Sequence, residues 1–197
     1  MESRTHAALV EVHGLGVLLV GPSGIGKSEC ALELVARGHR LVADDVVCLR
    51  RETGPGGDRL VGRAPDLIRH YMEIRGIGIL YVPELFGEGA VREEATVDLV
   101  CRLERWREDA QYERVGLERA SEEWLGVALP ALLLPVRPAG NMATLVEVAA
   151  RDAGLRRTGP TAASRLEDRF LRQVGSEAAA ADAAGRDPDA APEERRS

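Results

Sequence analysis

Residues 21–28 read GPSGIGKS, and this stretch decides the fold expected for the chain. It matches G-x-x-x-x-G-K-[ST], a loop whose backbone N–H groups cradle phosphates while its lysine reaches the β- and γ-phosphates. Lys27 is the only lysine in the chain, although 26 residues are lysine or arginine. A compact ammonium suits a tight glycine loop, whereas the planar guanidinium of arginine is too bulky for it. We therefore predict that a nucleotide is bound by Gly21, Pro22, Ser23, Gly24, Ile25, Gly26, Lys27 and Ser28.

The flanks of this loop supply the strand and the helix that such a loop requires. Residues 16–20 read GVLLV, a short apolar run of the buried-strand type. Residues 28–37 read SECALELVAR and place an apolar stripe on one helical face, with Gly38 where a helix commonly ends. The helix N-terminus would face the polyphosphate. The hydroxyl of Ser28 would ligate Mg²⁺.

Two adjacent acids interrupt the next apolar run, RLVADDVVCLR at 40–50, which we predict to be one buried strand. Asp44 and Asp45 are costly there unless something cationic compensates them. A strand end turning into solvent would also explain them. A P-loop enzyme, however, needs an acid near the γ-phosphate to hold metal or accept a proton. Because neighbouring strand residues point to opposite faces, we expect only one of the two to point squarely at the phosphates.

The remaining elements predict an α/β fold with a mixed β-sheet core and flanking helices. Residues 52–59 are rich in turn formers and should close a hairpin. A helix is expected from Pro65, with a buried stripe of Leu67, Ile68, Tyr71 and Met72. Strands are predicted at 96–105 and 129–136, and helices at 141–157, begun by Asn141, and at 162–174.

Composition limits the possible functions and partners. The net charge of −6 argues against a nucleic-acid or membrane binder that relies on basicity. The three widely spaced cysteines predict buried hydrophobes rather than disulfides. With no apolar run of eighteen residues and no signal pattern, we expect a cytoplasmic protein. Residues 1–174 should form the catalytic domain, and the Ala- and acid-rich 175–197 a disordered tail without a catalytic part.

Four segments together resemble the catalytic domain of the bacterial HPr kinase/phosphorylase family. They are GPSGIGKSECALELVARGHRLVADD (21–45), APDLIRHYMEIRGIGI (64–79), LFGEGAVR (85–92) and LPVRPAGNMATLVEVAA (134–150). EIRGIGI at this spacing behind a P-loop and a double aspartate is the specific part. The resemblance implies a P-loop phosphotransferase, similar to the phosphoenolpyruvate carboxykinase type, that transfers phosphate from ATP to a serine of HPr or an HPr-like phosphocarrier. Many members also run the reverse reaction with inorganic phosphate.

The resemblance also implies residue roles. Lys27 would stabilise the transferring charge, Asp45 would be the general base, and Asp44 would lie beside it near the metal. Ser28 and Glu73 would be the Mg²⁺ ligands. His6 and Arg114 match positions that the family treats as catalytic.

The chain departs from the family pattern at three positions. Pro22 replaces an acidic or polar residue, Tyr81 replaces the acid that ends the signature, and Gly140 stands where arginine is usual in the phosphorylase loop. We therefore expect kinase activity and a weakened phosphorylase. Because few residues precede His6, we expect the short, single-domain form, and family members are often hexamers, which implies a homo-oligomer.

Two other classes of function stay open from the residues alone. One is a regulatory module that binds nucleotide without transferring phosphate, and the other is a small-molecule kinase of the P-loop class. A pure switch has no use for a base that faces a serine, so Asp45 separates it from a kinase.

Overall fold

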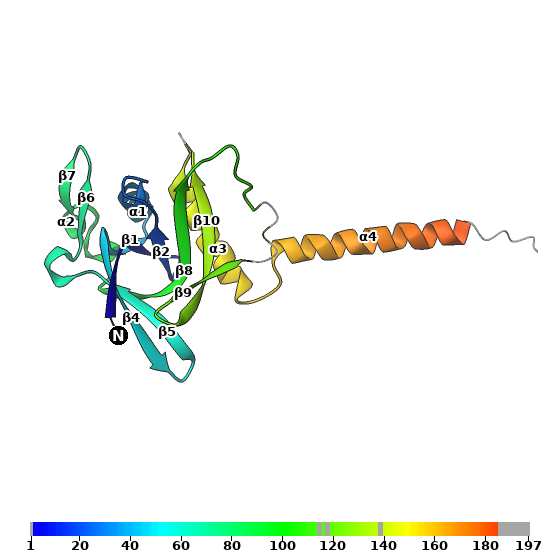
Figure 1. Cartoon of the computed structure of the whole chain (residues 1–197), viewed down its shortest axis with the longest axis horizontal. Coiled ribbons are helices and arrows are strands. Elements are labelled where there is room, and N and C mark those ends of the chain that lie inside the picture. Colours follow the sequence, from blue (N-terminus) through cyan, green and yellow to red (C-terminus); the bar gives the residue numbers. More distant parts are fainter. Residues whose placement is uncertain (1, 114–115, 117–118, 138–139, 185–197) are drawn as a thin grey trace, which may run out of the picture. The chain divides into compact units, whose positions relative to one another are not determined.

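The computed structural model describes residues 2–113, 116, 119–137 and 140–184, and the chain divides into two compact units, 1–159 and 160–197. The elements of the first unit are β1 (Glu2–Val12), β2 (Leu15–Val20), α1 (Lys27–Ala36), β3 (Arg40–Ala43), β4 (Val46–Gly54), β5 (Gly57–Arg63), η1 (Asp66–Ile68), β6 (Tyr71–Ile74), β7 (Gly78–Tyr81), α2 (Val82–Phe86), η2 (Glu88–Ala90), β8 (Glu94–Arg105), β9 (Ala120–Trp124), β10 (Val127–Val136) and α3 (Met142–Arg156) (Figure 1). The second unit contains helix α4 (Ala162–Ala184). None of the described helices is long and apolar enough to cross a membrane.

Strands β1 and β8 each run through two sheets and join them. β1 pairs with β4 along its first half and with β2 along its second half. β8 begins against β5 and then lies between β2 and β10, parallel to both. The main sheet therefore has the order β3-β1-β2-β8-β10-β9, and β4 and β5 form a smaller sheet between the first parts of β1 and β8. The predicted mixed sheet with flanking helices is confirmed.

The hydrophobic core lies on both faces of the main sheet. On one face, Val10 and Leu19 pack with Leu34 of α1 and with α3. On the other face, Leu9 and Leu18 pack with residues of the smaller sheet. Neighbouring strand residues thus enter opposite clusters, as the two-residue period of a strand requires. Both faces of β2 and of the second half of β1 are buried, which explains their apolar runs.

The order of the first three strands brings two chain turns to one edge of the sheet. β2 and β3 are both antiparallel to β1, so they run parallel to each other on either side of it. Their carboxyl ends therefore meet at the same edge. Gly21 follows β2 there, Asp44 follows β3, and His6 of β1 lies beside them, next to Ala7, whose N–H donates to the carbonyl of Asp45 at 3.2 Å.

Most elements expected from local pattern are confirmed. α1 buries the expected stripe, and Gly38 has the left-handed φ of 92° that ends such a helix. The hairpin at 52–59 joins β4 to β5, and the strands expected at 96–105 and 129–136 are β8 and β10. The cysteines are free and buried, and burial raises the pKa of Cys30 and Cys101 to about 12.

The prediction of a helix from Pro65 is wrong. Only the 3₁₀ turn η1 forms there, and the chain then makes the antiparallel hairpin β6–β7. Leu67 is 90% exposed, so the expected helical stripe does not exist. Met72 and Ile74 are buried while Tyr71 and Glu73 are exposed, which is the alternation of a half-buried strand.

The single strand expected over 40–50 is also wrong, because the two aspartates separate β3 from β4. Asp45 has a left-handed φ of 64°, and the N–H of Val46 donates to the carbonyl of Asp44 at 2.8 Å. Aspartate tolerates this conformation better than most residues because its side chain can bond locally. Since the pair lies in a turn, the alternation of a strand does not apply to it, and the expectation that only one carboxylate points to the phosphates loses this basis.

The helix expected at 162–174 continues to Ala184, beyond the boundary drawn at Gly175. Residues 178–181 and 183–184 are alanine, the residue with the highest helix propensity, which explains the extension. The expectation of a disordered tail is therefore wrong for 175–184, and 185–197 lie outside the described residues.

Asn141 caps α3 as expected, and this interaction can be tested by its effect on stability. Its side chain accepts a hydrogen bond from the N–H of Thr144 at 2.8 Å and donates to Glu33 of α1 at 2.7 Å. We expect Asn141→Ala to lower the free energy of unfolding by about 1 kcal/mol, measured by urea denaturation. Asn141→Ser keeps the cap and should recover most of that loss. Equal losses in the two variants would assign the effect to the bonds with Glu33 and Arg37 instead.

Candidate active site

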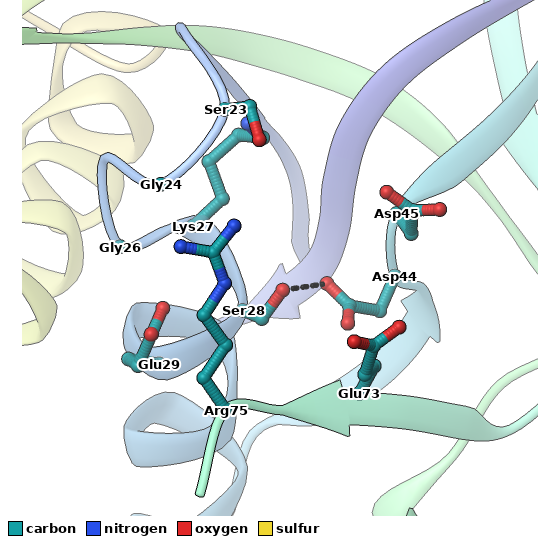
Figure 2. Close-up of a pocket in the computed structure, with 10 residues that line it drawn as sticks. All are labelled: Ser23, Gly24, Gly26, Lys27, Ser28, Glu29, Asp44, Asp45, Glu73 and Arg75. Atoms are coloured by element: carbon teal, nitrogen blue, oxygen red, sulfur yellow. Dashed lines mark hydrogen bonds between the residues drawn. The ribbon is translucent and has the colours of Figure 1, made fainter. Parts of the chain in front are cut away.

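The loop between β2 and α1 wraps around a hollow of about 160 Å³ (Figure 2). Gly24 and Gly26 have φ values of 74° and 101°, a backbone conformation that favours glycine. Gly26 is the N-cap of α1 and provides no side chain to satisfy the first amides of the helix. These free N–H groups and the positive end of the helix dipole make the loop a site for an anion.

The ammonium of Lys27 lies over this loop. Its Nζ donates to the carbonyl of Gly21 at 3.0 Å and to that of Pro22 at 3.2 Å. Neutral carbonyls hold the cation in place without neutralising its charge. Lys27 can therefore balance the negative charge of a bound phosphate.

Asp44 is the buried acid of the site. Its residue is only 4% exposed, and the hydroxyl of Ser28 donates to its Oδ1 at 2.9 Å. Burial raises the pKa of Asp44 above its ordinary value, and the Ser28 bond together with the Asp45 and Glu73 amides opposes that rise. Its second oxygen, Oδ2, is buried without a well-formed hydrogen bond among the described residues. Such a group costs free energy unless a cation or a ligand satisfies it.

The side chains around Asp44 fit Mg²⁺. Ser28 and Glu73 line the same hollow, and Figure 2 shows the Glu73 carboxylate beside that of Asp44. Mg²⁺ prefers oxygen ligands from one or two carboxylates, together with waters and substrate phosphates. The unsatisfied Oδ2 of Asp44 is the atom that such an ion would contact.

Asp45 stands apart from Asp44 by its exposure. Its side chain is 69% exposed, and its Oδ1 lies 3.4 Å from Nδ1 of His6, which is 80% exposed. The positive φ of Asp45 turns its carboxylate toward the open side of the hollow. The structure thus brings His6, Lys27 and Asp45, all expected from the sequence, to one edge of the sheet.

Arg75 and Glu29 also line the hollow and were not expected as site residues. Arg75 follows β6 and reaches across to the loop, so that a Cβ added to Gly24 would lie 3.4 Å from its Nη1. A substituent at Gly24 would therefore crowd this guanidinium. The only sequence signal for Arg75 was its place in EIRGIGI, and its reach depends on the hairpin that the sequence reading missed.

The remaining expected residues differ in their positions. Ile25 is 7% exposed and anchors the loop from below, so its side chain is not offered to a ligand. Gly21 and Pro22 line an adjoining open hollow together with His6. Arg114 lies outside the described residues, and its catalytic role stays a prediction.

A third hollow, of about 130 Å³, adjoins the acids on the side away from the loop. It shares Asp44, Asp45 and Glu73 with the phosphate-loop hollow. Its other walls are apolar, and they include Tyr71 and Ile79, which are 43% and 76% exposed. A polar, charged hollow and a partly apolar one therefore meet at the same carboxylates.

Comparison with known proteins gives one consistent result. The family model described as the HPr serine kinase C-terminal domain matches residues 1–170. The chain is 53% identical over 171 residues to the HPr kinase/phosphorylase of Caldanaerobacter subterraneus subsp. tengcongensis, and 52% identical over 165 residues to that of Geobacillus kaustophilus. These matches cover 87% and 84% of the chain, but only 55% and 52% of the relatives. The chain thus spans about half the length of these curated relatives.

A solved structure, that of the Hpr(Ser) kinase/phosphatase from Coxiella burnetii, is similar to the fold. It superimposes with a TM-score of 0.72 at 35% identity, and the match covers 80% of this chain and 99% of that one. At this level of identity the similarity extends beyond the fold to the sequence.

The unsatisfied carboxylate of Asp44 predicts opposite effects of Asp44→Asn with and without metal. In metal-free buffer at pH 7, the variant should raise the free energy of unfolding by about 1 kcal/mol, because it removes a buried charge. The folded-state pKa lies above the ordinary 3.8, so protonated Asp44 stabilises the fold at low pH. That contribution is lost as the pH rises through the folded-state pKa. The difference in stability between Asp44→Asn and the wild type should therefore vanish at a pH below the pKa of Asp44 in the unfolded state.

Addition of Mg²⁺ should make the wild type the more stable of the two proteins, since only the wild type has the carboxylate that the ion requires. Thermal unfolding with and without Mg²⁺, recorded for both proteins across pH, measures the two effects. Ser28→Ala is the matched control: it removes one of the two metal ligands expected from the sequence and leaves the buried charge of Asp44 in place. If Asp44→Asn is less stable than the wild type in metal-free buffer at pH 7, the assignment of Asp44 as a buried charge that requires a cation is contradicted.

Proposed function

Because the chain belongs to the family of HPr serine kinase C-terminal domains, we propose that it transfers the γ-phosphoryl group of ATP to a serine of HPr or an HPr-like phosphocarrier. One observation carries the proposal. A phosphate loop with its lysine and an exposed carboxylate, that of Asp45, face the same hollow from two strand ends. A site that only bound nucleotide would need the first of these and not the second.

The phosphate-loop side accounts for binding and charge neutralisation. The free amides of Gly26 and the residues after it, the Lys27 ammonium and the Arg75 guanidinium surround the place for the β- and γ-phosphates. Ser28, Asp44 and Glu73 would hold Mg²⁺, which would neutralise part of the negative charge of the triphosphate when bound. Phosphoryl transfer needs mainly such positioning and electrostatic stabilisation from the protein.

The exposed carboxylate accounts for the acceptor chemistry. The serine Oγ forms a bond to the γ-phosphorus as the bond from that phosphorus to the ADP oxygen breaks, and the hydroxyl proton passes to Asp45. His6, 3.4 Å from Asp45 Oδ1, orients this carboxylate. A positioned base of this kind typically contributes about 10²- to 10⁴-fold to the rate.

The hollow beyond Asp45 supports a protein acceptor rather than a small polar one. Tyr71, Met72 and Ile79 form an apolar wall beside the carboxylates. Side chains that flank a serine in a polypeptide can pack there, while the hydroxyl points to Asp45. A small polar metabolite would gain nothing from an exposed apolar wall.

The reverse reaction depends on a further phosphate site. Orthophosphate would attack phosphoserine, and Asp45 would return the proton to the serine oxygen. Gly140, in the loop before α3, places no cation there, which supports a slow phosphorylase. Adding orthophosphate to phosphorylated HPr measures the rate of the reverse reaction, which can then be compared with the forward rate.

We expect Asp45→Asn to lower the rate of phosphoserine formation on HPr by about 10²- to 10⁴-fold while ATP affinity stays within about twofold. Labelled ATP with Mg²⁺ and HPr measures the rate, and equilibrium binding of ATP measures the affinity. Asp58→Asn, which removes one charge from the tip of the β4–β5 hairpin, is the matched control and should leave both values near the wild type. If the wild-type protein binds ATP but leaves HPr unlabelled, the proposed function as an HPr kinase is excluded. Transfer to a metabolite instead would identify a small-molecule kinase.

The requirement for a compact cation gives an independent test. Lys27→Arg keeps the charge but introduces a planar fork that the loop cannot accommodate in the same place. We expect both Lys27→Arg and Lys27→Ala to lose at least about 10²-fold in the rate of transfer, measured in the same assay. Recovery of most of the activity by arginine would show that charge alone suffices and that the tight loop geometry is not needed.

A further inference from the structure

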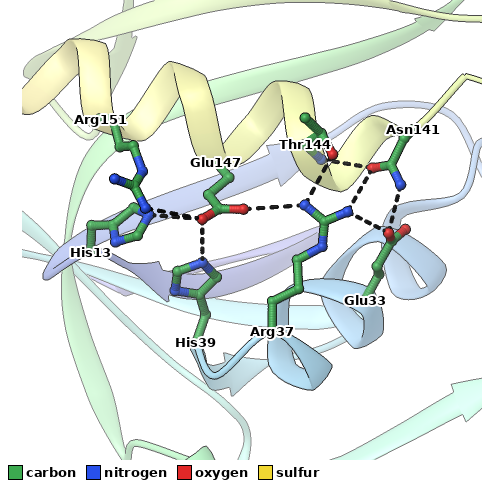
Figure 3. A network of polar contacts seen from close by, with 8 residues as sticks. All are labelled: His13, Glu33, Arg37, His39, Asn141, Thr144, Glu147 and Arg151. Carbon is green, nitrogen blue, oxygen red and sulfur yellow. Dashed lines mark hydrogen bonds and ion pairs between the residues drawn. The ribbon is translucent and has the colours of Figure 1, made fainter.

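Two histidines and a glutamate meet at the end of α1 opposite to the phosphate loop (Figure 3). His13 lies in the turn between β1 and β2, His39 follows the end of α1, and Glu147 projects from α3. One potential ligand atom from each residue lies within 4.8 Å of the other two. The proposed function uses none of these three side chains.

The distances in this cluster fit the coordination of one metal ion. His13 Nε2 lies 3.1 Å from Glu147 Oε1, and His39 Nε2 lies 3.6 Å from the same oxygen. Two atoms that each bind a tetrahedral Zn²⁺ at its usual bond length lie about 3.3 Å apart. The two imidazole rings meet edge to face, with centroids 4.7 Å apart.

The hydrogen bonds within the cluster do not satisfy His39. The residue is 8% exposed, and its Nε2 is buried without a hydrogen-bond partner among the described residues. The 3.6 Å separation from Glu147 is too long for a hydrogen bond. A buried polar atom without a partner calls for an explanation, and a ligand is one.

The surroundings hold Glu147 in a suitable state. Arg37 donates to Glu147 Oε2 at 3.1 Å, which leaves Oε1 turned toward the histidines. Chiefly because of this bond, the pKa of Glu147 falls to about 2, so the carboxylate is ionised. Arg37 is itself held by Glu33, Asn141 and Thr144. Metal ligands are commonly oriented by such outer partners.

One cation competes for the same oxygen. Arg151 approaches Glu147 Oε1 at 3.4 Å, but its side chain is 62% exposed and can turn into solvent. His13 is partly exposed, with a side-chain exposure of 31%, which leaves a path for an ion to enter. The cluster is therefore accessible from outside as well as anchored within.

We propose that His13, His39 and Glu147 bind one transition-metal ion of the Zn²⁺ type through His13 Nε2, His39 Nε2 and Glu147 Oε1, with a fourth position open to solvent. Two imidazole nitrogens and one carboxylate oxygen suit Zn²⁺, Ni²⁺ or Cu²⁺ and not Mg²⁺. The ten residues of α1 separate this site from the phosphate loop by about 15 Å. The bound ion joins the β1–β2 turn, the end of α1 and α3, so it stabilises the first unit against unfolding.

The test uses Zn²⁺ alone with the full chain, by calorimetric titration and by thermal unfolding. Wild-type protein should bind one Zn²⁺ at this site and unfold at a higher temperature with it. His13→Ala, at a partly exposed turn where the fold should tolerate it, should weaken the affinity by about 100-fold or more and abolish the rise in unfolding temperature. Co²⁺, whose visible absorption reports tetrahedral coordination, should give that absorption with the wild type and lose it in the variant.

The control separates this site from the carboxylates near the phosphate loop, which could also attract Zn²⁺. His6→Ala makes the same chemical change beside Asp45 and should leave the Zn²⁺ affinity within about twofold of wild type. Binding that His6→Ala weakens and His13→Ala does not would place the ion at the phosphate-loop site and overturn the proposal. An absence of Zn²⁺ binding to the folded wild type would overturn it as well.

Discussion

The pairing of β1 between β2 and β3 is the constraint on which the candidate active site depends. A strand that is antiparallel to both neighbours makes those neighbours parallel, so their carboxyl ends meet at one edge of the sheet. The phosphate loop follows one of these strands and the two aspartates follow the other. The amino-terminal half of β1 passes the same edge and carries His6 to Asp45. Slippage of β1 by one residue would turn its apolar side chains to the opposite faces and separate these groups.

The active-site edge contrasts with the core in how its polar groups are satisfied. The strands below it are dry on both faces, with Leu9, Leu18 and Leu19 fully buried. At the edge, among the residues that the structure describes, the buried carboxylate of Asp44 has one unsatisfied oxygen, and the Lys27 ammonium donates to two backbone carbonyls. The unsatisfied oxygen of Asp44 is a cost that the isolated fold carries, because a buried polar group without a partner destabilises it. A cation against Asp44 would relieve that cost, and an anion against Lys27 would neutralise the ammonium.

Helix α1 links the two polar regions of the first unit. Its first residue is Lys27, and Arg37 and His39 follow its last turn. Its buried face packs against the main sheet and α3, so neither end can move far without disturbing the core. Arg37 contributes to this rigidity, since it joins side chains of α1 and α3 through several hydrogen bonds. The geometry at each end of α1 is therefore preorganised by the same packed element.

The sequence by itself determined the features that depend on residues within one turn or one strand. The phosphate loop, the buried stripe of α1 and the cap at Asn141 follow from spacings of a few residues, because their hydrogen bonds and contacts close locally. The turn at Asp44 and Asp45 was misread because its conformation depends on the sheet that the flanking strands join. The β6–β7 hairpin, which forms a separate two-stranded sheet, was misread because the packing of Met72 and Ile74 into the core is not visible in the local pattern. Only the tertiary structure decided that Arg75 reaches the loop. It alone brought His13 to Glu147, 134 residues away, since sheet order and helix packing, rather than local spacing, set such distances.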